Sequence, residues 1–260
     1  MNTAMQAVIF CGGKGTRISG GDQAVKKELV EIGGRPILWH VMKILATYGY
    51  KDFILPLGYR GDLIRRYFLD YERMNRDVSF YLGDTERVCF WGENHEGDWR
   101  VTLVDTGLET SKGERVRRVA PYITSERFFL LYGDDVADVN VADLVRFHLT
   151  HGKAITITGY QPAYQYGVVE VNEDGLITDY HQYPQVDHWI NAGFMVIERA
   201  ALEALQEGMD LETEFLTCMA HRGEAMLYRH RGFWRSMNTF KDAQELNELW
   251  DAGRAPWKIW

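Results

Sequence analysis

Short apolar runs alternate with amphipathic segments along the first half of the chain. Residues 7–10, 53–55 and 128–132 are apolar runs of strand length, and each is bounded by glycine or polar positions, as buried parallel strands are. Between the first two runs, residues 36–49 carry apolar side chains at helical spacing, with a proline at the start and a glycine at the end. Residues 62–71 carry a second helical stripe. This alternation of strand and helix predicts a twisted, mainly parallel sheet with helices on both sides.

The second half of the chain has a more mixed pattern. Residues 154–158, 167–171 and 194–197 have the composition of strands, and Glu173-Asp174-Gly175 is typical of a hairpin turn. Helix caps are predicted where Asn140 precedes Asp143 and where Thr239 precedes Asp242, the latter opening a helix that ends at Gly253. We therefore expect an α/β fold with a few antiparallel strands flanking the parallel core. No repeat, low-complexity tract or linker divides residues 1–260, so a single domain is the simplest organisation.

Composition and charge narrow the function classes. The 260 residues are 46% hydrophobic and 25% charged, which excludes a disordered or fibrous protein. The formal net charge of −8 argues against a nucleic-acid partner but leaves room for a local basic pocket that binds a small anion. No apolar run approaches the roughly 20 residues of a membrane span, and the first residues lead straight into a strand rather than a signal peptide. Three widely spaced cysteines, Cys11, Cys89 and Cys218, favour reduced thiols, so we expect a cytoplasmic protein with no membrane partner.

The sharpest chemical feature is a glycine-rich turn directly after the first strand, Gly12-Gly13-Lys14-Gly15-Thr16-Arg17. Glycines let the backbone N–H groups approach an anion, and the two basic side chains add positive charge. The turn matches neither the Walker A nor the GxGxxG pattern, so a tight turn without a ligand stays an alternative. Lys26 and Lys27 lie ten residues further on, either facing the same phosphates or on a solvated surface.

Several segments together carry a resemblance to a known family. They include the glycine-rich turn, residues 30–40 (VEIGGRPILWH), 103–107 (LVDTG), 132–134 (YGD), 190–194 (INAGF) and 255–258 (APWK). In these the chain resembles the sugar-1-phosphate nucleotidyltransferases, and among them the glucose-1-phosphate cytidylyltransferases. The resemblance implies one nucleotidyltransferase-type domain over residues 1–260, with a nucleotide half at about 1–150 and an acceptor half at about 151–260.

The resemblance also implies an activity and a set of site residues. It implies Mg²⁺-dependent transfer of CMP from CTP onto a phosphorylated small molecule by in-line attack on the α-phosphorus, with release of pyrophosphate, in a homo-oligomer. Such a reaction requires positioning and charge neutralisation rather than a covalent nucleophile. Lys27, Arg17 and Asp134 fall on catalytic positions, and Asp134 with Asn238 on the Mg²⁺ ligands. The implied nucleotide contacts are Gly12, Gly13, Lys14, Gly15, Thr16, Arg115 and Gly133, and the implied acceptor contacts are Asn191, Tyr183, Gln182 and Arg235.

The chain departs from the family pattern at positions that bear on the acceptor and the metal. Gln182-Tyr183-Pro184 replaces a Glu-Lys-Pro motif whose lysine binds the sugar phosphate, and Arg235 is a candidate replacement for that lysine. Asn238 replaces an aspartate that binds metal, and Asp135 replaces a glycine and is a candidate substitute. Three hypotheses stay open: a cytidylyltransferase whose acceptor is not glucose 1-phosphate, an ordinary glucose-1-phosphate enzyme with compensated substitutions, and a non-catalytic nucleotide-binding relative with a regulatory or scaffold role.

Overall fold

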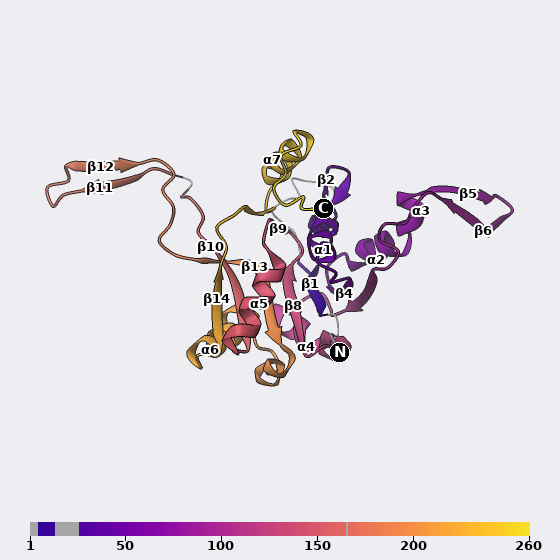
Figure 1. The fold of residues 1–260 in the computed structure, drawn as a ribbon, viewed down its shortest axis with the longest axis horizontal. Helices are drawn as coiled ribbons and strands as arrows, with labels where there is room; N and C mark the ends of the chain where they lie inside the picture. Colours follow the sequence, from indigo (N-terminus) through magenta and orange to yellow (C-terminus); the bar gives the residue numbers. More distant parts are fainter. Residues whose placement is uncertain (1–4, 14–25, 165) are drawn as a thin grey trace.

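A seven-stranded sheet forms the centre of the molecule (Figure 1). The structure is a computed structural model, and it describes residues 5–13, 26–164 and 166–260. The strands lie in the order β14 (Ala225–Arg229), β10 (Ile155–Tyr160), β13 (Ile190–Glu198), β8 (Arg127–Tyr132), β1 (Gln6–Phe10), β4 (Asp52–Leu57) and β7 (Arg100–Asp105). The sheet thus takes strands from both the predicted nucleotide half and the predicted acceptor half of the chain.

The sheet is mixed and mainly parallel, as predicted. Strand β1 runs parallel to β4 and β8, β4 runs parallel to β7, and β10 runs parallel to β14. Strand β13 is antiparallel to both of its neighbours, β8 and β10. The expectation that the antiparallel strands flank the parallel core is therefore wrong for β13, which lies inside the main sheet. Small antiparallel pairs do lie outside it: β2 (Glu31–Ile32) with β3 (Arg35–Pro36), and β9 (Asp135–Ala137) with β15 (Trp234–Ser236).

Helices cover both faces of the sheet, and the alternation along β1 shows why. Ala7 and Ile9 pack into the cluster that includes α1 (Ile37–Thr47), α5 (Val141–His151) and α7 (Phe240–Asp251). Val8 and Phe10 pack into the cluster that includes α4 (Lys112–Val119) and α6 (Thr217–His221). Successive strand residues point to opposite faces, so an apolar run without alternation must be buried on both sides.

The local signals of the sequence agree with the structure in most places. The Asp143 N–H donates to Asn140 Oδ1 at 3.1 Å, and Thr239 and Asp242 form a capping box at the start of α7. The predicted stripe at 62–71 is divided between α2 (Gly61–Leu69) and α3 (Tyr71–Asn75). Strands β7 and β14 were not predicted. The short helical segments are η1 (Lys27–Leu29), η2 (Ala120–Tyr122), η3 (Arg199–Ala204) and η4 (Leu211–Leu216).

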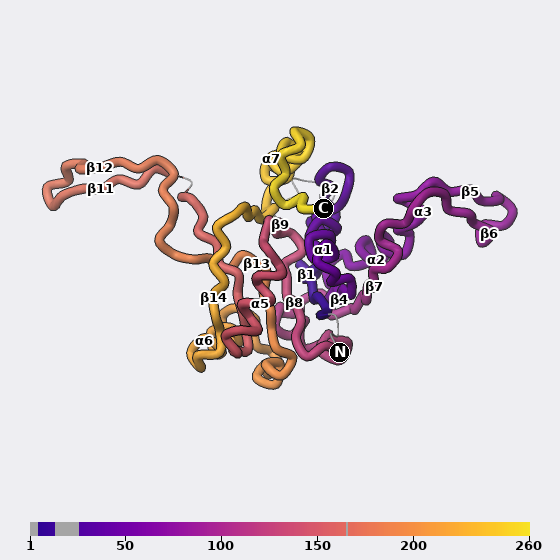
Figure 2. Tube along the Cα trace, viewed as in Figure 1, coloured from indigo at the N-terminus to yellow at the C-terminus, as the bar shows by residue number. Residues whose placement is uncertain are grey.

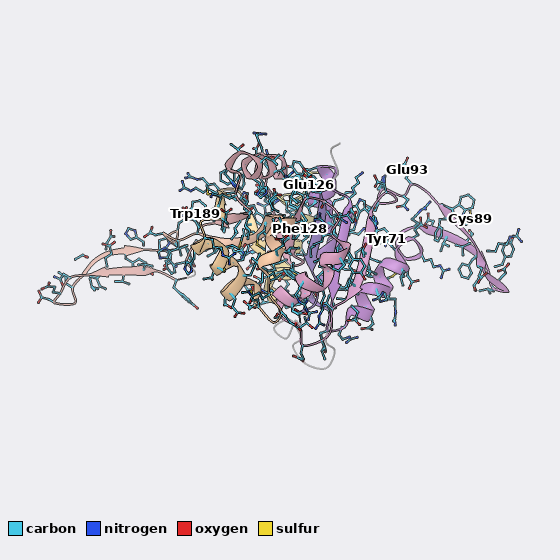
Figure 3. The ribbon with its side chains drawn as sticks, turned by 90° about the horizontal axis from the view of Figure 1, so that it is seen from below. Tyr71, Cys89, Glu93, Glu126, Phe128 and Trp189 are labelled. Atoms are coloured by element: carbon cyan, nitrogen blue, oxygen red, sulfur yellow. The ribbon has the colours of Figure 1, made fainter. Side chains whose placement is uncertain are left out.

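Two β-hairpins project from opposite sides of the sheet (Figures 1 and 2). The first arm is β5 (Asp77–Tyr81) with β6 (Asp84–Trp91), and the second arm is β11 (Val168–Val171) with β12 (Ile177–His181). The turn of the second arm is the predicted Glu173-Asp174-Gly175, with Gly175 at φ +84°. Figure 3 shows Cys89 on the first arm, well away from Phe128 in the central sheet.

Both arms expose large apolar side chains. These are Phe80, Tyr81, Leu82 and Trp91 on the first arm, and Val169, Val171, Leu176, Ile177 and Tyr180 on the second. On the second arm Val169 lies opposite Tyr180 and Val171 opposite Ile177, so one face of that hairpin is apolar.

Candidate active site

A cavity of about 790 Å³ lies where β1 and β8 end. Among the described residues, its walls come from the glycine turn (Gly12, Gly13), the segment leading into α4, the end of β8 and the first residues of β13. Ligands of open α/β sheets bind at the carboxyl ends of the strands, where loops and helix N-termini meet. The cavity therefore lies where the chain order predicts a binding site.

Lys27, Asp134 and Asn238 converge at one side of this cavity. The Lys27 ammonium forms an ion pair with Asp134 Oδ2 and donates to Asn238 Oδ1 at 3.0 Å. Asn238 Nδ2 donates to Ser236 Oγ at 3.0 Å, which fixes the amide so that its oxygen faces Lys27. The structure thus brings together three predicted residues that are up to 211 positions apart in the sequence.

The turn after β8 places Asp134 at the cavity by a close backbone approach. The Gly133 N–H donates to the carbonyl of Phe10 at 3.2 Å, and a Cβ on Gly133 would lie 2.7 Å from that oxygen. Asp135 is buried beneath Gly193, where φ is +78° and a side chain would collide with the carboxyl group. Burial, together with the neighbouring Asp134 carboxylate, raises the pKa of Asp135 well above its usual value. Asp135 therefore lines the cavity as a buried acid.

A buried ion pair holds the start of the glycine turn. The Lys26 side chain is only 1% exposed; its ammonium lies 3.2 Å from Glu28 Oε2 and donates to the carbonyl of Gly13 at 2.9 Å. Burial raises the pKa of Glu28, while Lys26 lowers it. Lys26 is thus neither a solvated surface residue nor a free phosphate ligand, and it positions the turn instead. The predicted ligands Lys14, Gly15, Thr16 and Arg17 lie outside the described residues.

The Arg115 guanidinium is surrounded by backbone. It donates to the carbonyls of Leu57 (3.0 Å), Gly107 (2.9 Å), Leu108 (3.2 Å) and Gly12 (3.3 Å), and to Thr106 Oγ1 (2.6 Å). A Cβ on Gly12 would lie 2.5 Å from Arg115 Cζ, so only glycine permits this approach. Arg115 lines the cavity, and its contacts tie together the end of β4 and the segments after β1 and β7, so it positions these parts of the wall. Its contact with the nucleotide stays a prediction.

Only one of the four predicted acceptor contacts lines the cavity. Asn191 does so, with its Oδ1 accepting from the Gly193 N–H at 2.9 Å. Gln182 and Tyr183 follow the second arm, and Tyr183 is 60% exposed with φ +56°. Arg235 forms an ion pair with Glu245 of α7. Within one copy of the chain these three residues are not brought to the cavity, because the arm carries the first two away from the sheet and α7 holds the third.

The donor set beside Lys27 fits a hard cation. Mg²⁺ prefers carboxylate and amide oxygens and keeps several sites for water and substrate phosphates. Asp134 Oδ2 and Asn238 Oδ1 both face the Lys27 ammonium, so two oxygen donors converge where a positive charge is already accepted. No cluster of three or more His, Cys, Asp or Glu side chains suited to a metal is found in the described part of the chain. A metal at this cavity would thus be held by Asp134, Asn238 and substrate oxygens.

Comparison with known proteins identifies the family. The model of the nucleotidyl transferase family matches residues 6–252. The chain belongs to this family. This nucleotidyltransferase is 40% identical over 258 residues to the probable glucose-1-phosphate cytidylyltransferase of Bacillus subtilis, covering 98% of this chain and 100% of the relative. It is 39% identical over 259 residues to the glucose-1-phosphate cytidylyltransferase of Salmonella typhi, with the same coverage.

Solved structures agree on the fold. HddC from Yersinia pseudotuberculosis, in a complex with GMP-PN, matches with a TM-score of 0.67 at 18% identity, over 95% of this chain and 99% of that one. The predicted fold class, family and enzyme class are therefore confirmed. Among the described residues, no helix is long and apolar enough to cross a membrane.

Sequence reasoning missed the roles of several cavity residues. Neither the Lys26–Glu28 pair nor the backbone contacts of Arg115 follow from a motif. The signal for the Lys26–Glu28 pair was a lysine and an acid two residues apart in the segment that follows the glycine turn. Trp234, whose indole N–H donates to the Ala192 carbonyl at 2.8 Å, also lines the cavity. Residues 232–234 (GFW) are among the segments that carry the resemblance, but no role of Trp234 followed from them.

Proposed function

We propose that this nucleotidyltransferase transfers CMP from CTP onto a phosphorylated small molecule, a sugar 1-phosphate or close analogue, and releases pyrophosphate. The observation that carries the proposal is the convergence of Lys27, Asp134 and Asn238 on one cavity, in a chain 40% identical to a protein named as a probable glucose-1-phosphate cytidylyltransferase. A non-catalytic scaffold has no electrostatic need for a partly buried lysine and carboxylate, such as Lys27 and Asp134, at such a site.

The reaction is an in-line displacement at phosphorus. An oxygen of the acceptor phosphate forms a bond to the α-phosphorus of CTP, the bond from that phosphorus to the bridging oxygen breaks, and pyrophosphate leaves with the electron pair. Lys27 neutralises negative charge on the reacting phosphates, and the Gly12–Gly13 backbone borders the triphosphate. Lys26 and Arg115 keep that backbone in place. Positioning and charge neutralisation supply the rate enhancement, so no covalent intermediate is needed.

Mg²⁺ is part of the proposal, with Asp134 and Asn238 as its protein ligands. When bound, the ion neutralises charge on the phosphates of CTP. The amide of Asn238 contributes an oxygen without a charge, so we expect weaker metal binding than with two carboxylates. Asn238→Asp should therefore lower the Mg²⁺ concentration needed for half-maximal turnover. A higher Mg²⁺ concentration for half-maximal turnover in that variant would contradict the assignment of Asn238 as a ligand.

Two candidates for the acceptor follow from different observations. Identity to proteins named glucose-1-phosphate cytidylyltransferases favours glucose 1-phosphate. The presence of Gln182-Tyr183-Pro184 in place of Glu-Lys-Pro favours another phosphorylated acceptor, and this stays our prediction. We further propose a homo-oligomer, supported by the exposed apolar side chains on both arms. We propose a cytoplasmic location on the ground of the three widely spaced cysteines. Sedimentation velocity should show an assembly, and replacing Val171 and Ile177 with Lys should dissociate it; a monomeric wild-type protein would refute this part.

The test is pyrophosphate release with CTP, UTP, GTP, ATP and dTTP against a panel of sugar phosphates, cyclitol phosphates and phosphonates, with Mg²⁺ present. Release with CTP and one acceptor would support the proposal and identify the acceptor. Release with glucose 1-phosphate above all others would refute the prediction of a different acceptor. Binding of CTP without release with any acceptor would favour the non-catalytic alternative.

A further inference from the structure

Two polar side chains outside every predicted motif meet at the wall of the cavity, which Lys112 lines. Lys112, the first residue of α4, forms an ion pair with Glu212, the second residue of η4, although 100 positions separate them. Glu212 Oε1 also accepts from the Tyr132 hydroxyl at 2.6 Å. The Lys112 ammonium lies 4.7 Å from the centre of the Tyr132 ring, which adds a cation–π contact.

Close backbone packing brings the first residues of α4 and η4 together. A Cβ on Gly113 would collide with the carbonyl oxygen of Met209, so glycine lets the start of α4 pack directly on the segment before η4. Ser111 Oγ donates to the same Met209 carbonyl at 3.2 Å. Packing of the two backbones therefore holds Lys112 and Glu212 close to each other, while both side chains remain accessible to solvent.

The pair lies on the acceptor side of the cavity. Asn191 Nδ2 lies 3.5 Å from the Tyr132 hydroxyl, so a line of polar contacts runs from Lys112 through Glu212 and Tyr132 to Asn191. Lys112, Tyr132 and Asn191 all line the cavity. The side chains of Lys112 and Glu212 are 47% and 32% exposed, so both can reach a ligand from their present positions.

The chemistry of the pair indicates what it binds. A lone lysine would attract a second anionic group, but here the Glu212 carboxylate stands against the ammonium and would repel such a group. A neutral pair of hydroxyl groups suits both partners, because the ammonium donates to one hydroxyl oxygen and the carboxylate accepts from the other hydroxyl. The Tyr132 hydroxyl, which donates to Glu212, fixes the orientation of the carboxylate.

We infer that Lys112 and Glu212 form a specificity subsite for adjacent hydroxyl groups on an uncharged, hydroxyl-rich ring of the acceptor. This inference rests on the proposed function and deepens it. The phosphate of the acceptor lies toward Lys27, and the ring lies toward Lys112. An acceptor with a second anionic group on the ring is discriminated against by Glu212.

The test measures binding, so it does not require turnover. Calorimetry on the full chain compares methyl phosphate with glucose 1-phosphate, galactose 1-phosphate, mannose 1-phosphate and myo-inositol 1-phosphate. The wild type should bind at least one ring-bearing phosphate roughly tenfold or more tightly than methyl phosphate. Lys112→Met and Glu212→Gln should each reduce that preference by about tenfold while leaving methyl phosphate and CTP binding unchanged, and Lys112→Arg should restore most of it.

Matched controls lie away from the cavity. Lys241→Met and Glu207→Gln remove exposed side chains of the same types and should change no affinity. Equal binding of all ring-bearing phosphates and methyl phosphate by the wild type would overturn the subsite, as would an unchanged preference in Lys112→Met. Loss of methyl phosphate affinity in Lys112→Met would mean that Lys112 binds the phosphate and not the ring. Ring selectivity without pyrophosphate release would overturn the proposed function and leave the subsite standing.

Discussion

Replacing Arg115 with methionine tests whether this residue holds the walls of the cavity together. The substitution keeps the apolar stem of the side chain and removes five hydrogen bonds to the end of β4 and to the loops after β1 and β7. The Gly12 carbonyl loses its bond to Arg115 in buried surroundings, and a buried acceptor left without a partner costs about 1–3 kcal/mol. The Leu57 carbonyl keeps the bonds that it accepts from the N–H and the hydroxyl of Thr106, so the loss of each of the other four bonds costs only about 0.5–1.5 kcal/mol. Water entering from the cavity can replace the outer contacts. We therefore expect a loss of about 3–5 kcal/mol in the free energy of unfolding.

Urea denaturation followed by tryptophan fluorescence measures this loss, with CTP affinity measured on the folded variant. Arg115→Met should also weaken CTP binding, because Gly12 is no longer tied to Leu57 and Thr106. Arg115→Lys should recover only a small part of the stability, since an ammonium cannot contact three loops in the planar fork of a guanidinium. Arg146→Met is the matched control: Arg146 lies on α5 and forms an exposed ion pair with Asp143, so its replacement should change stability by about 0.5 kcal/mol or less. A loss below about 1 kcal/mol for Arg115→Met would refute the positioning role.

Three further predictions concern charge and pH. Asp134→Asn should reduce turnover by about 10²-fold or more and leave the circular dichroism spectrum unchanged, because the amide keeps the shape of the side chain but removes its charge beside the reacting phosphates. Full activity of this variant would exclude Asp134 from metal binding. Lys26→Met should destabilise the protein by about 3 kcal/mol, because it leaves the Glu28 carboxylate buried and unpaired. In a double-mutant cycle, adding Glu28→Gln should recover at least half of that loss, and strictly additive losses would contradict the pairing. Burial lowers the pKa of His40 from 6.5 to about 4, so stability should fall by about 3 kcal/mol as pH decreases from 6.5 to 4. His40→Gln should flatten that pH dependence, whereas the exposed His95→Gln should not; equal profiles for both variants would contradict the assignment.

The sign of the His40 effect follows from its hydrogen bonds. Its Nε2 lies 2.8 Å from the Ile32 carbonyl and donates to it, so Nδ1 is left to accept from the Trp257 indole N–H at 3.3 Å. Protonation of Nδ1 would remove that acceptor and bury a charge. Above pH 6.5 the ring is neutral in both the folded and the unfolded state. Between pH 6.5 and 4 the unfolded state takes up a proton that the folded state does not, so the stability of the fold decreases as the solution becomes more acidic.

Periodicity in the sequence was sufficient for most of the main sheet. Apolar runs such as 7–10 and 128–132 are buried on both faces, and this property is local enough to be predicted from a single segment. Strand β7 was missed because Arg100–Asp105 is half-buried at the edge of the sheet and lacks a continuous apolar run. The sequence did not predict that the two arms project from the sheet, because apolar strand residues normally indicate a core. No residue of the arms shows by its type that these strands lie outside the core.

The candidate site was predictable where a motif carries the chemistry. Lys27, Asp134 and Asn238 were placed by the resemblance, and the structure brings them together. The contacts of Arg115 and Lys112 were not predictable, because each depends on loops that come close only after the sheet has formed. Lys112 and Glu212 are 100 positions apart, and neither lies in a pattern that points to the other.

The most direct test of the central claim is the ³¹P spectrum of a reaction with CTP, Mg²⁺ and the best acceptor from the pyrophosphate screen. We expect the CTP resonances to decline while pyrophosphate and a cytidine diphosphate ester of the acceptor appear in equal amounts, and we expect Asp134→Asn to form neither. Hydrolysis of CTP to CMP without an acceptor-linked product, or no change in a protein that binds CTP, would contradict the claim that this cavity joins a nucleotide to a phosphorylated acceptor.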